Sequence, residues 1–259
     1  MIDERFARAL HVETLRNDEL FAGSEPHVLF QASTIGALLE GAYDGDVTFR
    51  ELARHGDLGL GTLNGLDGEM IALDGDFYRA DLDGNVSEVD PDAATPFAVV
   101  VPFASSIDLD LPSALDRDEL LAALDQAAPD GRACALRVDG DFELVRARSV
   151  PRQTPPYRPL TEVVASQHVY EIRDVSGTIV GMRFPDHAGG IEVSGYHLHF
   201  IDADRRRGGH VLDCRTASVR AQIDPSSELR VELPPGIDLS EPHLEMPPQE
   251  ALRQVEAEG

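Results

Sequence analysis

Three of the nine histidines in this 259-residue chain fall in one segment, YHLHFIDADRRRGGHVLDC, which begins at Tyr196. His197 and His199 are two positions apart in a run of Tyr, Leu, Phe and Ile, residues that favour a β-strand. Side chains two apart in a strand point to the same face. The polar stretch that follows ends in Gly-Gly, which suits a turn, and a strand pattern resumes at His210. A hairpin would therefore bring His210 back toward the other two imidazoles.

Three neutral imidazoles around an open fourth position are the ligand set of many catalytic zinc sites. We therefore predict that His197, His199 and His210 bind Zn²⁺. Cys214 lies four residues beyond His210, so regular strand alternation would place it on the same face. A closed structural site of three histidines and this cysteine is the alternative.

A cupin-type metal site is a second alternative, because cupins also begin with His-x-His on a strand. Such a protein would be a metal-dependent oxygenase that uses redox-active iron held by two histidines and one carboxylate. Cupins need a glutamate a few residues later, and this chain has Asp202 and Asp204 there. The cupin pattern therefore fails at its carboxylate ligand.

The elements around the histidines predict an α+β fold. We expect a helix at the N-terminus, a buried strand over Val28–Ser33, a helix over Ile35–Ala42 and another begun by a capping box of Thr48 and Glu51. Asp-Gly pairs favour tight hairpin turns. They predict a meander after residue 57 and a further hairpin within ALRVDGDFELVRARSV, and they begin at Asp67, Asp74, Asp83 and Asp139.

The later elements divide the chain. Thr95–Phe103 reads as a core strand, and Asp116 begins a helix. Four prolines between Pro151 and Leu160 cannot lie in a helix or a central strand. We expect two α+β halves, residues 1–153 and 154–259, each built on a mixed or antiparallel sheet with flanking helices. A last helix is expected in PPQEALRQVEAEG.

Acidic residues outnumber basic ones by 47 to 22, for a formal net charge of −25, and every basic side chain other than histidine is arginine. Such a charge is best tolerated where salt screens it, because the Debye length falls to about 3 Å at molar salt. We therefore predict adaptation to a high-salt cytoplasm. An acidic surface that recruits basic partners is the alternative. Nucleic acid is excluded as a ligand because no basic patch with interleaved aromatics is present.

The N-terminal sequence MIDERFARALHVETLRNDEL has no continuous apolar segment, so it predicts neither a secretory signal nor a membrane span. We expect a cytoplasmic protein without a membrane partner. The two cysteines, Cys134 and Cys214, are far apart in the chain and give no disulfide framework.

Four segments carry a more specific pattern: LFQASTIGALLEGAYDGDVTFRELARHGDLGLGTLNGLDGEM, TPFA, RARSVPRQTPPYRPL and GYHLHFIDADRRRGGHVLDC. Together, in this order and at this spacing, they resemble α-acetolactate decarboxylase. They extend from about residue 28 to residue 214. The family more often has phenylalanine where this chain has Leu58 and Leu63, which bears on the shape of the pocket.

The resemblance implies roles for individual residues. The three histidines match the family's zinc ligands, Glu69 in LDGEM matches a carboxylate beside the metal, and Thr62 in GLGT matches a residue that lines the substrate pocket. Arg148 in RARSVPRQ matches the family's arginine, with Arg146 and Arg152 as nearby rivals. The acidic residue of the last helix is Glu256, with Glu258 as the alternative.

The family's chemistry explains these residue types. Loss of CO2 from 2-acetolactate leaves an enediolate, so a zinc ion chelating the hydroxyl and keto oxygens would stabilise the developing charge. A glutamate, Glu69 or Glu256, would protonate the new carbanion, and Arg148 would orient a carboxylate. The resemblance implies (R)-acetoin as product and a homodimer as the assembly. A binding protein that keeps the fold without the chemistry is the remaining alternative.

Overall fold

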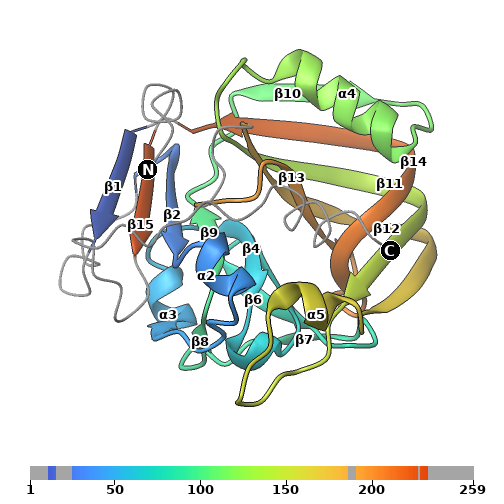
Figure 1. Ribbon diagram of the computed structural model, residues 1–259. Coiled ribbons are helices and arrows are strands. Elements are labelled where there is room, and N and C mark those ends of the chain that lie inside the picture. Colours follow the sequence, from blue (N-terminus) through green and yellow to red (C-terminus); the bar gives the residue numbers. More distant parts are fainter. Residues whose placement is uncertain (1–10, 16–24, 186–190, 227, 233–259) are drawn as a thin grey trace.

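Two large β-sheets dominate the computed structural model (Figure 1), which describes residues 11–15, 25–185, 191–226 and 228–232. The first sheet has eight strands, in which β1 and β2 run parallel to β15 and the other pairs are antiparallel. Its spatial order is β1 (His11–Leu15), β15 (Glu228–Glu232), β2 (Val28–Ala32), β9 (Ala98–Val101), β4 (Leu58–Thr62), β5 (Glu69–Leu73), β6 (Asp76–Ala80) and β7 (Val86–Glu88).

The second sheet has five antiparallel strands, three of which are long. Its order is β10 (Ile107–Leu111), β14 (Gly208–Pro225), β11 (Cys134–Ser149), β12 (His168–Phe184) and β13 (Gly195–Asp202). Because β13 also pairs with the start of β14, each of the strands β14, β11, β12 and β13 is paired with two of the others, and the four form a closed ring. A two-stranded ladder joins β3 (Val47–Thr48) to β8 (Ala94–Thr95).

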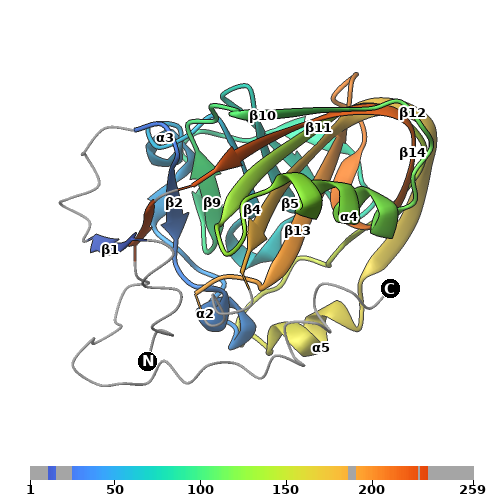
Figure 2. The same ribbon diagram turned by 90° about the horizontal axis from the view of Figure 1, so that it is seen from above.

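The helices are short, and α4 (Arg117–Ala127) lies over the five-stranded sheet (Figure 2). The others are α2 (Ile35–Leu39), α3 (Phe49–Leu52), the 3₁₀ turn η1 (Asn64–Leu66) and α5 (Leu160–Val164). In the part of the chain that the structure describes, no helix has the length and apolar character needed to cross a membrane.

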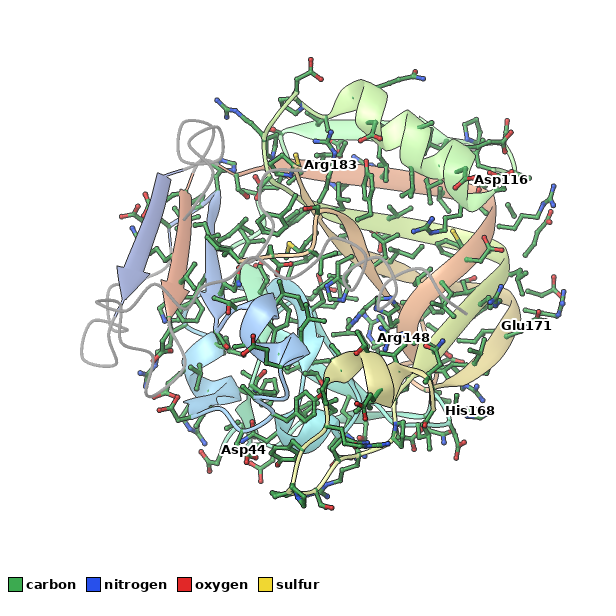
Figure 3. All side chains as sticks on the ribbon, in the orientation of Figure 1. Asp44, Asp116, Arg148, His168, Glu171 and Arg183 are labelled. Atoms are coloured by element: carbon green, nitrogen blue, oxygen red, sulfur yellow. The ribbon has the colours of Figure 1, made fainter. Side chains whose placement is uncertain are left out.

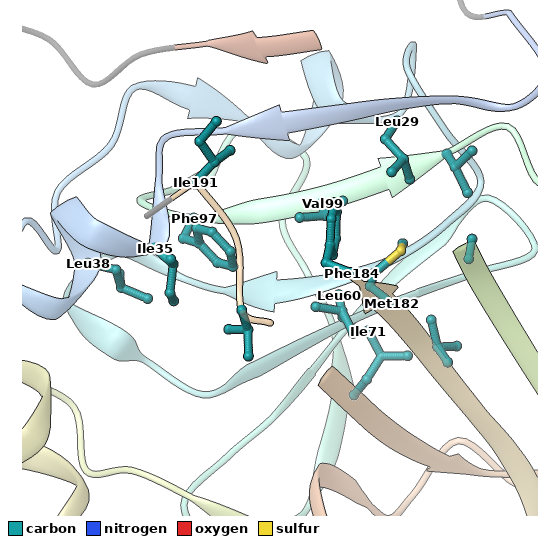
Figure 4. Packing of buried hydrophobic residues seen from close by; sticks show 14 of the residues in the cluster. Leu29, Ile35, Leu38, Leu60, Ile71, Phe97, Val99, Met182, Phe184 and Ile191 are labelled. Carbon is teal, nitrogen blue, oxygen red and sulfur yellow. The ribbon is translucent and has the colours of Figure 1, made fainter. Parts of the chain in front are cut away.

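Three apolar clusters form the core. The largest lies between the two sheets, where Leu60 and Ile71 of the first sheet share a cluster with Met182 of the second (Figure 4). The outer face of the eight-stranded sheet packs on Phe49 and Leu52 of α3, and the other face of the five-stranded sheet packs on α4. Both sheets therefore bury apolar side chains on two faces, and the central strands β2, β9, β4 and β5 are buried along their whole length instead of alternating.

Several local predictions are confirmed. Thr48 and Glu51 form the capping box of α3, and Asp116 caps α4. Asp74 and Gly75 both have positive φ in the turn between β5 and β6, as a two-residue hairpin turn with this handedness requires. The strand at Val28 and the helix at Ile35 are also present.

The predicted hairpin at Asp139 is wrong, because β11 runs without a turn from Cys134 to Ser149. Gly140 has φ +149°, a value that L side chains rarely adopt, and pairs with Gly177 on one side and Val219 on the other. A Cβ at this position would lie 2.3 Å from the carbonyl oxygen of Ser218. The glycine therefore allows a close approach of two strands instead of forming a turn.

The N-terminal helix is also contradicted where it can be checked, since residues 11–15 form strand β1, paired in parallel with β15. The rest of that predicted helix and the predicted last helix lie outside the described residues. The sheets do not follow the predicted boundary at residue 153. β10 and β11 precede it but belong to the five-stranded sheet, and β15 follows it but lies in the eight-stranded sheet.

Candidate metal centre and active site

The three histidines meet on the face of the five-stranded sheet that is turned toward the other sheet. On β13, His197 and His199 alternate with Leu198 and Phe200, which pack in the cluster beneath α4. In the hairpin, His199 pairs directly with His210 of β14. The ring centroids are 5.0 to 5.4 Å apart, and one nitrogen from each ring lies within 4.8 Å of the others. The predicted hairpin and the meeting of its imidazoles are confirmed.

A backbone carbonyl of the other sheet orients the central imidazole. His199 Nδ1 lies 2.8 Å from the Met70 carbonyl oxygen of β5. A carbonyl can only accept, so Nδ1 carries the proton and Nε2 keeps its lone pair. That lone pair points at His197 Nε2, 3.2 Å away. The arrangement presents nitrogens in the form that binds a metal ion.

Burial keeps the imidazoles of His197 and His199 neutral, and His210 is buried beside them. All three side chains are at most 8 % exposed. Burial first, and then the neighbouring His199 and Arg148, hold the pKa of His197 well below its usual value. Burial also lowers the pKa of His199 to about 3, although its bond to Met70 opposes the shift. At neutral pH neither ring competes for a metal ion with a proton.

A buried ion pair lies beside the histidines. Arg148 Nη1 donates to Glu69 Oε1 over 2.9 Å, and Glu69 Oε2 is 3.6 Å from His199 Nε2. Figure 3 shows Arg148 in the interior, between α5 and the strands of the five-stranded sheet. Strand pairing fixes both residues, because Arg148 lies opposite His210 and Glu69 lies opposite Thr62. The rival Arg152 has a largely exposed side chain that contacts Asp67.

Burial raises the pKa of the Glu69 carboxyl, and the Arg148 guanidinium opposes that rise. Burial and the ion pair therefore shift the pKa of this carboxyl in opposite directions, a pattern common in groups that transfer protons.

A pocket of about 420 Å³, a volume that includes solvent at its mouth, lies over these groups. Its polar wall contains Thr62, Glu69, Arg148, His197 and His210. Its other wall is apolar and is formed by Ile35, Leu38, Leu66, Phe97, Val150 and Leu160. The apolar wall is the part of the site that sequence reasoning missed, because these residues come from five separate segments and resemble ordinary core positions.

Thr62 lines this pocket, and its hydroxyl donates to the Gly68 carbonyl oxygen over 2.8 Å. Leu58 and Leu63 do not line it; they are buried in two different apolar clusters. The leucines at these two positions therefore act on the pocket only through packing. Glu256 and Glu258 lie outside the described residues.

Cys214 does not join the histidines. A register shift between β11 and β14 falls between His210 and Cys214, so the cysteine pairs with Val145 while His210 pairs with Arg148. An inserted residue reverses the strand alternation. Cys214 consequently packs in the cluster beneath α4, and the closed site of three histidines and a cysteine is wrong.

Asp202 also serves a structural purpose. Its Oδ1 accepts hydrogen bonds from the backbone N–H groups of Arg206 and Arg207, at 2.7 and 3.1 Å. It therefore closes the hairpin loop, and Asp204 is exposed. Neither aspartate belongs to the group of potential metal ligands, which counts against the cupin alternative.

Gly209 should not tolerate a side chain. Its φ is +153°, and a Cβ would lie 2.2 Å from the Tyr170 hydroxyl, which itself donates to the Gly208 carbonyl over 2.7 Å. We expect Gly209→Ala to lower the free energy of unfolding by about 1–3 kcal/mol through overpacking, in addition to backbone strain. Urea unfolding measures the loss.

Gly131→Ala is the control for this prediction. Gly131 also has positive φ, at +68°, but a Cβ there would meet nothing within 4 Å. Its substitution carries the strain alone. Equal losses for the two variants would contradict the crowding at Gly209.

Comparison with known proteins agrees with this site. A family model described as alpha-acetolactate decarboxylase matches residues 29–245. The chain is 48% identical to the alpha-acetolactate decarboxylase of Methylococcus capsulatus over 236 residues, which cover 90% of each chain. It is 45% identical to that of Methanosarcina mazei, over 88% of this chain and 80% of the relative.

A solved structure gives the same result. The crystal structure of alpha-acetolactate decarboxylase from Bacillus subtilis strain 168 matches with a TM-score of 0.84 and 36% identity, over 89% of this chain and 99% of the other. This chain belongs to the alpha-acetolactate decarboxylase family.

Proposed function

We propose that the protein catalyses the zinc-dependent decarboxylation of (S)-2-acetolactate to (R)-acetoin and CO2. The observation that carries the proposal is the meeting of three buried imidazoles with the Glu69–Arg148 pair in one pocket. Membership of the decarboxylase family supports it. We further propose the roles that follow for His197, His199, His210, Thr62, Glu69, Arg148 and Glu256.

The spacing of the imidazole nitrogens suits zinc. Two nitrogens that bind one tetrahedral zinc at about 2.0–2.1 Å are separated by roughly 3.3 Å. His197 Nε2 and His199 Nε2 are 3.2 Å apart. The Nδ1 proton of His199 is held by Met70, so its Nε2 is available as a ligand. Neutral nitrogen ligands also leave the full positive charge on the ion.

A zinc ion held by the three histidines would supply a Lewis acid that stabilises negative charge on the hydroxyl and keto oxygens of the substrate. The other steps belong to side chains. Arg148 lines the pocket and its guanidinium has the planar fork that suits a carboxylate, so it would orient the substrate carboxylate from the same wall.

Proton delivery completes the reaction. After CO2 leaves, the carbanion carbon must take a proton on one face to give a single enantiomer. Glu69 lies at the pocket, and burial raises the pKa of its carboxyl, which is the direction that favours a proton donor. Glu256 is the second candidate for this step. The apolar wall opposite limits water, which would otherwise protonate the carbon from either face.

The test combines metal analysis with one assay. Purified protein should contain about one zinc per chain and convert racemic 2-acetolactate to (R)-acetoin. Iron in place of zinc, with oxygen consumption, would support the oxygenase alternative. A protein with zinc and no acetoin formation would support a binding protein on the same fold.

We also propose that the acidic surface adapts the protein to a salty cytoplasm and that the chain forms a homodimer. With a net charge of −25, self-repulsion at low ionic strength should oppose the compact state. We expect the melting temperature to rise from about 0.1 M to molar KCl, while turnover per folded molecule changes little. Calorimetry and sedimentation in the same buffers measure stability and assembly. A melting temperature that is flat or falls over this range would favour a basic partner instead.

A further inference from the structure

A second pocket lies apart from the histidines, at the end of β15. Glu232 is the last described residue of this strand, which lies between β1 and β2 in the eight-stranded sheet. Its side chain is buried, with 5 % of the residue exposed. Its Oε2 has no hydrogen-bond partner among the described residues. A buried carboxylate oxygen without a donor or a cation is strongly disfavoured.

The pocket around Glu232 is acidic. Its lining contains two further carboxylates, Asp44 and Asp46, and no basic side chain. Both aspartates are exposed, and Figure 3 shows Asp44 at the edge of the molecule. Asp44 also accepts a hydrogen bond from the Tyr157 hydroxyl. Glu232 therefore lies at the bottom of the pocket and the aspartates lie toward its mouth.

The lining of this pocket contains no positively charged side chain to balance its three carboxylates. Burial first, and then the negative charges of Asp46 and Glu51, raise the pKa of Glu232 to about 7. The rise shows that the surroundings oppose a bare negative charge at the pocket floor. Either a proton or a cation must relieve it near neutral pH.

We propose that this pocket binds a small inorganic cation of the hard class, with Glu232 as its direct ligand. The charged groups of the pocket are all carboxylates, which suit Na⁺, K⁺, Mg²⁺ or Ca²⁺ and not zinc. Only the histidine triad brings three ligand atoms within 4.8 Å of one another among the described residues. Asp44 and Asp46 therefore act through ordered water, as is common for cations that retain part of their hydration shell.

The site is independent of the decarboxylase chemistry, although it lies close to the catalytic sheet. Thr95 lines this pocket, and its hydroxyl donates to the Thr62 carbonyl over 2.7 Å. The Ser33 N–H donates to the Glu232 carbonyl over 2.7 Å, which joins β2 to the end of β15. A bound cation would therefore fasten the strands next to the substrate pocket and stabilise the fold.

Melting temperatures at constant ionic strength test the proposal. Zinc is kept saturating, and choline chloride is replaced stepwise by KCl, NaCl, MgCl2 or CaCl2 in separate titrations. We expect at least one ion to raise the melting temperature saturably, by about 5 °C at a hundredfold excess over its Kd. General screening depends on ionic strength alone and would give no such difference.

Glu232→Gln keeps the shape of the side chain and should lose the ion-specific rise. Asp46→Asn should shift the titration to higher ion concentration. Asp110→Asn removes the same charge from an exposed position on β10 and should behave as the wild type. The proposal is overturned if the wild type responds only to ionic strength, or if Glu232→Gln keeps the same ion-specific rise. Acetoin formation is measured separately, so its absence would not bear on this site.

Discussion

His199→Ala is expected to lose bound zinc and to reduce kcat by at least about a thousandfold. Of the three proposed ligands, His199 is the one with an orientation fixed from the other sheet, because its Nδ1 is held by Met70 while its Nε2 faces His197. Each factor of ten in rate corresponds to about 1.4 kcal/mol, and a Lewis acid at developing charge contributes several kcal/mol. Metal analysis after dialysis and an acetoin assay measure the two losses.

The fold should survive this substitution. The cluster between the sheets contains many buried aliphatic residues from both sheets, and the histidines are not among them. His197→Ala and His210→Ala should resemble His199→Ala, because all three rings surround one point. A variant that keeps stoichiometric zinc and substantial turnover would remove its histidine from the site.

Two substitutions serve as controls. His168→Ala removes an imidazole whose side chain is half exposed and contacts Asp83, so zinc and activity should be unchanged. Cys214→Ser should also keep both, since the cysteine packs on the other face of the sheet. Loss of zinc from the cysteine variant would contradict the strand register seen here.

The histidine hairpin could be predicted because its information is local. Strand alternation, a polar turn and a resumed strand lie within YHLHFIDADRRRGGHVLDC, and the pairing of His199 with His210 follows from them. The helix caps at Thr48 and Asp116 were equally local. In contrast, Glu69, Thr62 and Arg148 were found only through resemblance, because an isolated Glu, Thr or Arg has no pattern of its own.

Long-range pairing explains what could not be predicted. Asp139-Gly140 has the sequence of a hairpin turn, but pairing with strands on both sides holds it extended. The bulge that turns Cys214 away from His210 depends on the partner strand and not on the residues between them. The contact from Met70 to His199 joins residues 129 positions apart. Tertiary contacts decided each case.

Glu69→Gln is expected to affect both catalysis and stability. As the proposed proton donor, Glu69 should contribute about 10²–10⁴-fold to kcat. Its loss also leaves the Arg148 guanidinium buried without its anionic partner, since both side chains are less than a tenth exposed. Breaking a buried ion pair on one side costs about 3–5 kcal/mol of unfolding free energy. Single-turnover kinetics and urea unfolding measure the two effects.

The double variant Glu69→Gln with Arg148→Met separates these effects. Removing the arginine charge as well should restore most of the lost stability, because a buried pair can often be replaced by groups without charge at little net cost. Activity should stay low, because the variant lacks both the proposed proton donor, Glu69, and the arginine proposed to orient the substrate carboxylate, Arg148. A double-mutant cycle without coupling would show that the 2.9 Å contact contributes nothing to the fold. If Glu69→Gln alone keeps near wild-type kcat, the proton comes from another acid, and Glu256→Gln and Glu258→Gln then identify it by which of them loses turnover.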